Sequence, residues 1–296
     1  GHRCFEILKK WGYLKGRTYL VDNNSREGGV IDFTQFLSEA DNPFIIIAIN
    51  SGVFLNEYMP KLFDRGFSAR QIGIVCSNSI RSFEALKKVI HCPKHTLLDV
   101  GCGSGIHAQI FEDFGKDVTG ITMSKQGMYS AQGFKNVLIG DYQDFKFNKK
   151  FEIVWMSHVL EHIVDVRKVL EKTRTEVLCD KGTLAITVPS SEKNITLSHV
   201  HSFDAGRILR YLLYAGFDCR NAMILAYGFD LSVILPEANS LPEHLVFHEC
   251  GGGHSPDDDD FGKLKELFDY LPKEIEVRTV WDGNLNFDGN ITKLNW

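Results

Sequence analysis

Apolar and polar positions form alternating strand-like and helix-like patterns along most of this chain. From residue 96 onward, short apolar runs typical of buried strands are separated by longer segments in which apolar residues recur every three or four positions. The predicted strands cover 96–100, 117–121, 136–139, 151–156, 182–188, 218–226 and 230–235. The predicted helices cover 77–90, a segment from about 105, 124–132, 163–177 and 204–215. Strands that alternate with helices predict a Rossmann-like α/β fold, in which a mainly parallel sheet has helices on both faces.

The chain before and after this region has a different pattern. Before it, strands are predicted at 17–21, 44–49 and 71–75, with helices at 32–40 and up to Phe63. After Pro236 the periodicity weakens, and only a helix near 261–270 and a strand near 275–280 are predicted. We therefore expect three parts: a small Rossmann-like α/β module at 1–76, a main domain at 77–236, and a C-terminal extension at 237–296 as a candidate lid for a substrate pocket.

Composition narrows the classes of partner. The chain has 296 residues, a hydrophobic fraction of 44%, a net charge of −5 and a pI near 6.1. This acidic balance argues against nucleic acid as the main partner. Apolar runs such as 44–49 are too short to cross a bilayer, and the seven cysteines form no C-x-x-C pair, which is typical of reduced thiols. We expect a cytoplasmic protein without a membrane span.

A glycine-rich turn follows the first strand of the main domain. The segment Leu97-Leu-Asp-Val-Gly-Cys-Gly-Ser-Gly105 combines a buried strand, a D-x-G-x-G-x-G turn and the start of a helix. Glycines in such a turn let a ligand approach backbone N–H groups without a Cβ in the way. Dinucleotide-binding turns have the spacing G-x-G-x-x-G, whereas this turn resembles the first motif of class I S-adenosylmethionine-dependent methyltransferases. The resemblance implies that Asp99 engages the ammonium group of the cofactor and that the turn holds its methionyl end. The turn residues concerned are Gly101, Cys102, Gly103 and Gly105.

The ends of the next two strands carry further candidates for cofactor contact. Most members of this family have an Asp or Glu for the ribose hydroxyls at the end of the second strand, but this chain has Thr122. The segment Gly-Ile-Thr-Met-Ser-Lys-Gln at 120–126 resembles cyclopropane fatty-acid synthases instead, which implies ribose or adenine contact by Thr122, Met123 and Gln126. After the third strand, the resemblance to methyltransferases places Asp141 at the adenine amino group and Tyr142 against the ring. An ordinary cap by Asp141 is the alternative.

A histidine-containing segment follows the fourth strand. Ser157-His-Val-Leu-Glu-His162 resembles the S-x-V-L-E-H segment of many small-molecule methyltransferases, which implies that Ser157 and His158 touch the methionine part of the cofactor. Methyl transfer needs a group that removes the proton of the acceptor, and His158 is one candidate base. If a helix begins at His158, then Glu161, His162 and Asp165 share a face with it.

A second pair of histidines precedes the last predicted helix of the main domain. His199 and His201 are two residues apart, so they face the same side of an extended segment. Their spacing resembles the H-x-H-x-F approach to the substrate pocket in similar methyltransferases. Either histidine is a candidate base that completes a site with His158 and Glu161, and a surface pair without a task is the alternative.

The same residues offer a metal-binding alternative. The pattern from His158 to His162 resembles the Glu-x-x-Glu-His motif of metal-dependent small-RNA and ubiquinone-pathway methyltransferases, but His158 replaces the first Glu. A divalent ion on Glu161, His162 and His199 is therefore not favoured over hydrogen bonding within the fold. The cluster at 248–254 has ligand types that suit zinc, yet its glycines fix no geometry, and we interpret it as a loop.

Together these features predict an S-adenosylmethionine-dependent methyltransferase. It would move a methyl group to an oxygen or nitrogen of a small polar acceptor and release S-adenosylhomocysteine. Residues 17–75 resemble an accessory module of sugar-modifying enzymes in bacterial surface-polysaccharide pathways, which implies a saccharide acceptor. A packing scaffold or a dimerisation surface is the alternative role of this module, so a homodimer is a candidate assembly. A non-catalytic cofactor-binding or scaffold protein and a lipid or nucleic-acid methyltransferase are the alternative functions.

Overall fold

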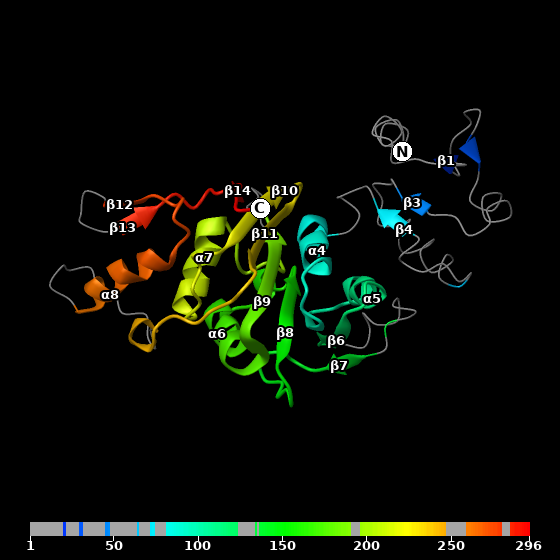
Figure 1. Cartoon of the computed structure of the whole chain (residues 1–296), viewed down its shortest axis with the longest axis horizontal. Coiled ribbons are helices and arrows are strands. Elements are labelled where there is room, and N and C mark those ends of the chain that lie inside the picture. Colours follow the sequence, from blue (N-terminus) through cyan, green and yellow to red (C-terminus); the bar gives the residue numbers. More distant parts are fainter. Residues whose placement is uncertain are drawn as a thin grey trace. The chain divides into compact units, whose positions relative to one another are not determined.

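The chain forms two compact units, Gly1–Ile80 and Arg81–Trp296. In the second unit the computed structural model describes residues 81–123, 134, 136–190, 196–246, 259–279 and 285–296, and in the first it describes 20–21, 30–31, 45–47, 64 and 72–74 (Figure 1). The predicted helices at 32–40, up to Phe63 and at 124–132 lie outside the described residues, as does the cluster at 248–254.

Four short strands of the first unit form two parallel pairs. β1 (Leu20–Val21) pairs with β2 (Val30–Ile31), and β3 (Ile45–Ile47) pairs with β4 (Ile72–Ile74). β1, β3 and β4 fall within the predicted strands, and β2 has no counterpart among them. Parallel strands require a connection that crosses from the end of one strand back to the start of the next, and this is the pattern of an α/β module.

A mixed sheet with the strand order β14-β10-β11-β9-β8-β5-β6-β7 dominates the second unit. Its bounds are β5 (Thr96–Val100), β6 (Asp117–Thr122), β7 (Val137–Ile139), β8 (Phe151–Ser157), β9 (Leu178–Pro189), β10 (Met223–Tyr227), β11 (Asp230–Leu235) and β14 (Lys293–Leu294). The strands β5 to β9 pair in parallel, whereas β11 runs antiparallel to β9 and to β10. The predicted Rossmann-like, mainly parallel sheet is confirmed.

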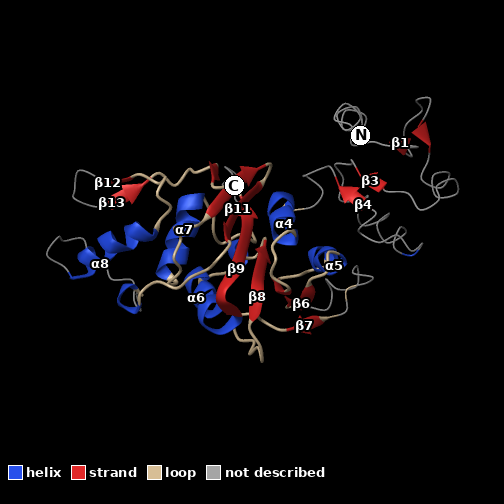
Figure 2. Cartoon of the chain, viewed as in Figure 1, coloured by secondary structure: helices blue, strands red, loops and turns tan. Residues whose placement is uncertain are grey.

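Helices cover both faces of this sheet. Figure 2 shows α6 (Val166–Lys172) and α7 (Ala205–Tyr214) on one face and α4 (Phe83–Ile90) and α5 (Ile106–Asp113) on the other. The remaining elements are α8 (Asp259–Leu267), the 3-10 turns η3 (Leu160–His162), η5 (Glu243–Leu245) and η6 (Phe268–Tyr270), and the antiparallel pair β12 (Val277–Thr279) and β13 (Leu285–Phe287).

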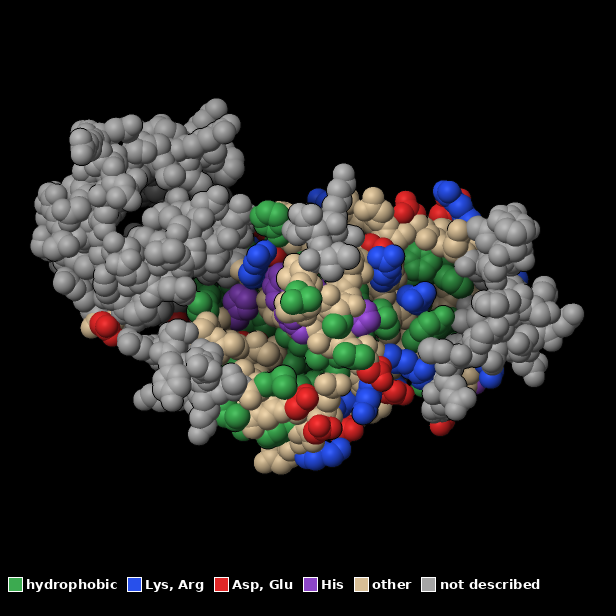
Figure 3. Space-filling model, turned by 180° about the vertical axis from the view of Figure 1, so that it is seen from behind, with side chains coloured by type: hydrophobic (Ala, Val, Ile, Leu, Met, Phe, Trp, Pro, Cys, Tyr) green, Lys and Arg blue, Asp and Glu red, His purple; other side chains and the backbone are tan. Residues whose placement is uncertain are grey.

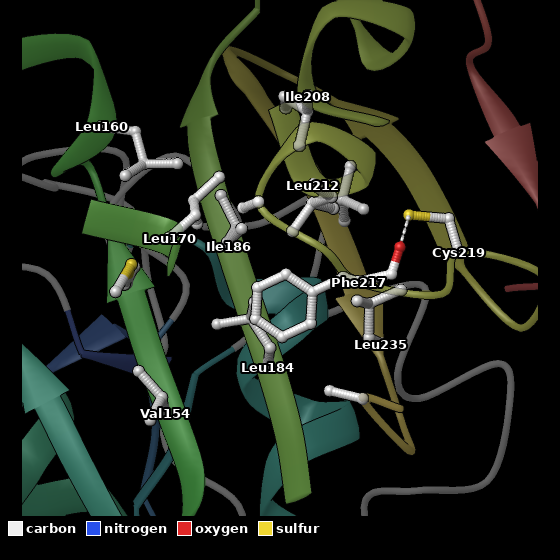
Figure 4. Close-up of a cluster of buried hydrophobic side chains, with 14 of the residues drawn as sticks. Val154, Leu160, Leu170, Leu184, Ile186, Ile208, Leu212, Phe217, Cys219 and Leu235 are labelled. Carbon is white, nitrogen blue, oxygen red and sulfur yellow. Dashed lines mark hydrogen bonds between the residues drawn. The ribbon is translucent and has the colours of Figure 1, made fainter. Parts of the chain in front are cut away.

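The core lies between the central strands and the helices α6 and α7. Figure 4 shows Leu184 and Ile186 of β9 facing Leu170 of α6 and Leu212 of α7, and all four side chains are almost fully buried. Each such side chain contributes roughly 1.5–3 kcal/mol relative to an exposed position. This packing fixes the carboxyl ends of β5 and β8, where the candidate site residues follow.

The predicted helix at 163–177 is wrong in its bounds and continuity. The chain forms η3, becomes extended at Ile163, and starts α6 only after Asp165, whose side chain accepts a hydrogen bond from the Lys168 N–H. The turn at 173–177 then widens to a π-helix that runs into β9. A continuous helix from His158 is therefore excluded, because the Asp165 cap precedes a helix that begins only at Val166.

The C-terminal extension is part of the second unit. β14 pairs with β10 at the edge of the sheet, and the Gly206 N–H of α7 donates to the Gly289 carbonyl. A Cβ at Gly206 would lie 2.5 Å from the Gly289 Cα, so this close approach requires glycine. Within the described ranges, no helix combines the length and the apolar character needed to cross a membrane.

Candidate active site

The glycine turn has the backbone conformation that its sequence predicts. Gly101, Gly103 and Gly105 have φ angles of 70°, 50° and 78°, in the left-handed region that favours glycine. A Cβ at Gly101 would lie 2.7 Å from Cγ2 of Val159, whereas within the described part of the chain a Cβ at Gly103 would meet only the Gly101 carbonyl oxygen, at 3.8 Å. Gly101 therefore permits close packing against the segment after β8, and Gly103 leaves open space above the turn.

Asp99 lies at the end of β5, directly before this turn. Its side chain is 2% exposed, and among the described residues its Oδ2 atom has no hydrogen-bond partner. Burial raises the pKa of Asp99 to about 8, although the backbone N–H of Ala108 donates to the carboxyl group. A buried acid with one unpartnered oxygen is costly, and a cationic donor from a ligand would stabilise it.

The other candidate cofactor residues have mixed placements. Thr122 ends β6 and is half-buried, and the Met123 side chain is 74% exposed. One Asp141 oxygen accepts from the Gln143 N–H, so this carboxylate holds a turn after β7. Gln126 lies outside the described residues.

Cys102 and Tyr142 point into the core. The Cys102 thiol packs against Gly120, where an added Cβ would lie only 2.8 Å from the Cys102 Sγ. The backbone N–H of Cys102 donates to the Ile121 carbonyl. The Tyr142 ring is buried, and its hydroxyl is bonded to the Thr173 hydroxyl at 2.7 Å. The structure thus places the Tyr142 ring among core side chains, which is a correction to its expected position against an adenine ring.

His158 follows β8 and is held by two carboxylates. Its φ angle is 55°, its Nδ1 lies 3.1 Å from Oε1 of Glu161, and its Nε2 lies 3.0 Å from Oδ1 of Asp230. Burial opposes a charge on this ring, but the hydrogen bonds to Asp230 and Glu161 outweigh it and raise the pKa of His158 to about 9. Both ring nitrogens donate in this arrangement, so no lone pair is free to remove the proton of an acceptor.

Glu161, His162 and His199 are brought together by η3 and the segment 196–201. The N–H groups of Val200 and His201 both donate to the Glu161 carbonyl, and the rings of His162 and His199 lie 5.0 Å apart. One ligand atom from each of Glu161, His162 and His199 lies within 4.8 Å of the others.

This group could hold a divalent cation. His162 Nδ1 donates to the Ser198 carbonyl at 2.9 Å, which leaves its Nε2 lone pair available. Among the described residues Oε2 of Glu161 is buried without a hydrogen-bond partner. These are the three residues that the sequence names as the metal-binding alternative, whereas Asp165 caps α6 instead.

The remaining candidates are His201, which follows this group in the chain, and Ser157, which ends β8. His201 is half-buried, and its Nε2 donates to the Val164 carbonyl at 3.2 Å, which leaves Nδ1 with a lone pair. The Ser157 hydroxyl is bonded to the Ser82 hydroxyl at 2.6 Å. Figure 3 shows histidine side chains gathered on one face of the molecule with apolar side chains close by.

Sequence reasoning missed Asp230. This buried side chain begins β11 and reaches His158 across 72 positions of sequence, so no local spacing connects the two residues. The one signal was an acid at the start of an otherwise apolar strand, Asp230-Leu-Ser-Val-Ile-Leu235. A buried charge at such a position requires a partner.

Comparison with known proteins bears on this site. Residues 98–186, from β5 to β9, match the model of a methyltransferase domain family. This match agrees with the methyltransferase class expected from the glycine turn.

Curated relatives of this chain include several proteins named ubiquinone biosynthesis O-methyltransferase. The one from Bradyrhizobium diazoefficiens is 26% identical over 151 residues, which are 48% of this chain and 58% of that protein. The one from Rhodopseudomonas palustris (strain TIE-1) is 26% identical over 113 residues, which are 34% of this chain and 44% of that protein. This chain spans about half the length of the curated relatives it matches. Neither name points to the saccharide acceptor that residues 17–75 imply.

Solved structures include a SAM-dependent methyltransferase from Aquifex aeolicus. The two sequences are 20% identical, and the structures superpose with a TM-score of 0.43. The match covers 59% of this chain and 96% of the Aquifex protein.

Proposed function

We propose that the chain binds S-adenosyl-L-methionine and transfers its methyl group to an oxygen of a small acceptor. The observation that carries this proposal is the buried carboxyl of Asp99, one oxygen of which has no partner among the described residues, next to the glycine turn. The cofactor would supply a methyl group on a positively charged sulfur. The match of the domain to a methyltransferase family supports the reaction class, and the names of the relatives support oxygen as the acceptor atom.

The residues around the turn would hold and orient the donor. Asp99 would accept the ammonium group in a charge-assisted hydrogen bond. The absent side chain of Gly103 would let the donor lie on the backbone. Thr122 and Asp141, at the ends of neighbouring strands β6 and β7, would bind the ribose and adenine groups.

A histidine of the segment 196–201 would remove the acceptor proton. His158 has both ring nitrogens bonded to carboxylates, so it does not serve this role in the present arrangement. His201 has one nitrogen fixed as a donor to Val164, and its other nitrogen would be the base. His199 is the alternative base, and its ring lies against His162.

The surroundings of the histidines favour an acceptor with an apolar part. Val164, Leu197 and Val200 are 80%, 100% and 55% exposed, and they lie in the same short segments as the histidines. An aromatic acceptor would bury these side chains, whereas a free sugar would bury few of them. The saccharide acceptor stays a second candidate, supported only by the resemblance of residues 17–75.

Two matched glycine variants test the donor site. Gly103→Ala and Gly115→Ala each place a side chain at a positive φ, 50° and 84°, and among the described residues neither new Cβ has a contact closer than 3.8 Å. The backbone cost of the two substitutions is therefore similar, about 1–2 kcal/mol. We expect calorimetry to show S-adenosylhomocysteine binding in Gly115→Ala and a loss of at least about tenfold in Gly103→Ala. Equal affinity in the two variants would exclude the turn as the binding site.

A methyl-transfer assay tests the reaction. Release of S-adenosylhomocysteine is measured with a phenol, a catechol, a primary amine and a monosaccharide as acceptors. We expect turnover with a ring hydroxyl, strongly reduced by His201→Gln and retained by His244→Gln, a surface control paired with Glu266. Turnover with the amine or the monosaccharide alone would overturn the proposed acceptor, and cofactor binding without any turnover would favour a non-catalytic binding protein.

A further inference from the structure

Asp230 joins three distant segments of the second unit. Its Oδ2 accepts the Ser82 N–H at 2.7 Å, its Oδ1 lies 3.0 Å from Nε2 of His158, and the Arg81 guanidinium lies 3.5 Å from the same oxygen. The side chain is 4% exposed. Burying a carboxyl group is costly unless donors converge on it, and both oxygens of Asp230 have such partners here.

The His158 backbone shows that this arrangement holds the residue under strain. A φ of 55° is uncommon for a residue with a side chain, and such a conformation persists only where its surroundings determine it. The N–H of His158 donates to the Thr187 carbonyl, and both ring nitrogens are bonded. Glu161 holds the ring from the same segment, and Asp230 holds it from the β10–β11 hairpin.

A second set of hydrogen bonds leads from Asp230 to the helix that follows the glycine turn. His107 of α5 has its Nε2 3.0 Å from the Arg81 carbonyl, and its Nδ1 accepts from the Trp155 indole at 3.3 Å. Burial lowers the pKa of His107 to about 4, so this ring is neutral and its Nε2–H donates. Through Arg81 and Ser82, the helix after the turn and the His158 ring are therefore tied to the same carboxylate.

We propose that Asp230 is a positioning residue for methyl transfer, which fixes the His158 ring at the end of β8 and so holds the acceptor side of the site against the glycine turn. This inference rests on the proposed function. Asp230 itself does not touch the reacting atoms. Its removal would leave Asp99 and the glycine turn in place, because Asp230 reaches helix α5 only indirectly, through the Arg81 carbonyl and His107. It would misplace the His158 ring beside the acceptor, which lowers turnover steeply because rates fall with small displacements.

Asp230→Asn tests this role, because it keeps the shape of the side chain and removes its charge. We expect the turnover number with the acceptor found in the panel to fall about 10- to 100-fold, while the KM for the donor and the affinity for S-adenosylhomocysteine stay within about threefold. Asp218→Asn is the matched control, because Asp218 is also buried and pairs with Arg220. The control should lose stability without this selective loss of turnover.

Two further measurements separate positioning from a general loss of structure. Asp230→Glu retains the charge and should recover part of the turnover. In the double variant with His158→Asn, the loss should be no larger than in the more affected single variant, because both changes act through the same ring. Asparagine tolerates the left-handed backbone, so His158→Asn stays informative if Asp230→Asn does not fold.

Nitrogen NMR of the His158 ring provides a readout that needs no acceptor. The Nε2 signal, assigned by its absence in His158→Asn, should shift in Asp230→Asn and stay unchanged in Asp218→Asn. An unshifted signal, or unchanged turnover in Asp230→Asn, overturns the inference. Failure of the wild type to bind S-adenosylhomocysteine would instead overturn the proposed function.

Discussion

Asp99 is a buried acid and His158 a half-buried base at the carboxyl ends of neighbouring strands, and their surroundings raise the pKa of both, so that each group favours its protonated form. Burial favours the neutral form of Asp99, and the contacts with Asp230 and Glu161 favour the cationic form of His158. Groups whose pKa values are displaced in this way concentrate at functional sites. The donor site therefore begins with a neutral acid that a cationic ligand would ionise.

Proton release on binding tests this view of Asp99. With a pKa near 8 the free protein keeps the Asp99 proton at neutral pH, and a bound ammonium group favours the carboxylate. Below about pH 8, binding of S-adenosylhomocysteine should therefore release a proton and strengthen as the pH rises. Calorimetry at pH 7 in two buffers with different ionisation enthalpies measures this release. Asp99→Asn should abolish it, and release that persists in this variant would assign the proton to another group.

Gly101→Ala tests the close contact between the glycine turn and the segment after β8. The substitution carries the left-handed backbone cost of about 1–2 kcal/mol and a clash with Val159 that costs typically about 1–3 kcal/mol more. Gly115→Ala carries only the first cost, because no atom of the residues that the structure describes lies within 4 Å of its Cβ. Thermal melting should rank the two variants in that order, and Val159→Ala should recover part of the Gly101→Ala loss. Equal melting temperatures would show that the segment moves away without cost.

At the scale of single residues, the sequence predicts those features that depend only on neighbouring residues within one motif. The positive φ angles of the turn and the buried position of Asp99 follow from the order of acid and glycines. The partner of His158 does not, because Asp230 reaches it only after β11 inserts beside β9 in the sheet. The position of Tyr142 also depends on tertiary packing, since its hydroxyl partner Thr173 lies 31 residues away.

Helix α7 begins with an aspartate cap, and this cap offers a test at the scale of the element. The Asp204 side chain accepts the Arg207 N–H at 2.7 Å, so Asp204→Ala should destabilise the second unit by about 1 kcal/mol. Asp204→Asn keeps the cap and should retain most of the stability. Chemical denaturation measures both, and an equal loss in the two variants would assign the effect to the Arg207 ion pair instead.

The contact between η3 and the segment 196–201 brings Glu161, His162 and His199 together, so metal binding by these three residues can be tested. We expect Zn²⁺ titrated into the chelator-treated protein to bind, and His162→Ala to weaken this binding about tenfold or more. His244→Ala removes an exposed histidine outside this group and serves as the control. Binding that is unaffected by His162→Ala would place the ion elsewhere.

Element boundaries were predictable where apolar runs are bounded by charged or glycine residues. Strands β5 and β11 have the predicted limits, and α7 differs by one residue at each end. The region after β8 was not predictable, because apolar residues at helical spacing continue through Ile163 while the Asp165 cap delays the helix. The strand expected from 218 starts at Met223, since Asp218 and Arg220 form a local ion pair before it.

For the whole molecule, the alternation of strands and helices predicted the layered fold correctly. Local periodicity did not predict two long-range features of the sheet. These are the antiparallel position of β11 between β9 and β10, and the pairing of β14 at the edge. The boundary between the two units lies after Ile80, directly before the Arg81–Ser82 pair that contacts Asp230.

A fragment that begins at Arg81 tests the independence of the second unit. It contains the glycine turn, the histidines and Asp230, so we expect it to fold and to bind S-adenosylhomocysteine as the full chain does. Circular dichroism and calorimetry measure folding and affinity. A folded fragment with lost affinity would show that the first unit contributes to the donor site.

The central claim is that Asp99 and the glycine turn form a site for a sulfonium amino acid, and calorimetry with S-adenosylhomocysteine tests it most directly. The wild type should bind one equivalent, and Asp99→Asn should weaken binding at least about tenfold, because it removes a charge-assisted hydrogen bond. Asp117→Asn, an exposed acid of β6 paired with Lys149, should leave the affinity unchanged. No binding by the wild type, or equal affinity in Asp99→Asn, would contradict the account.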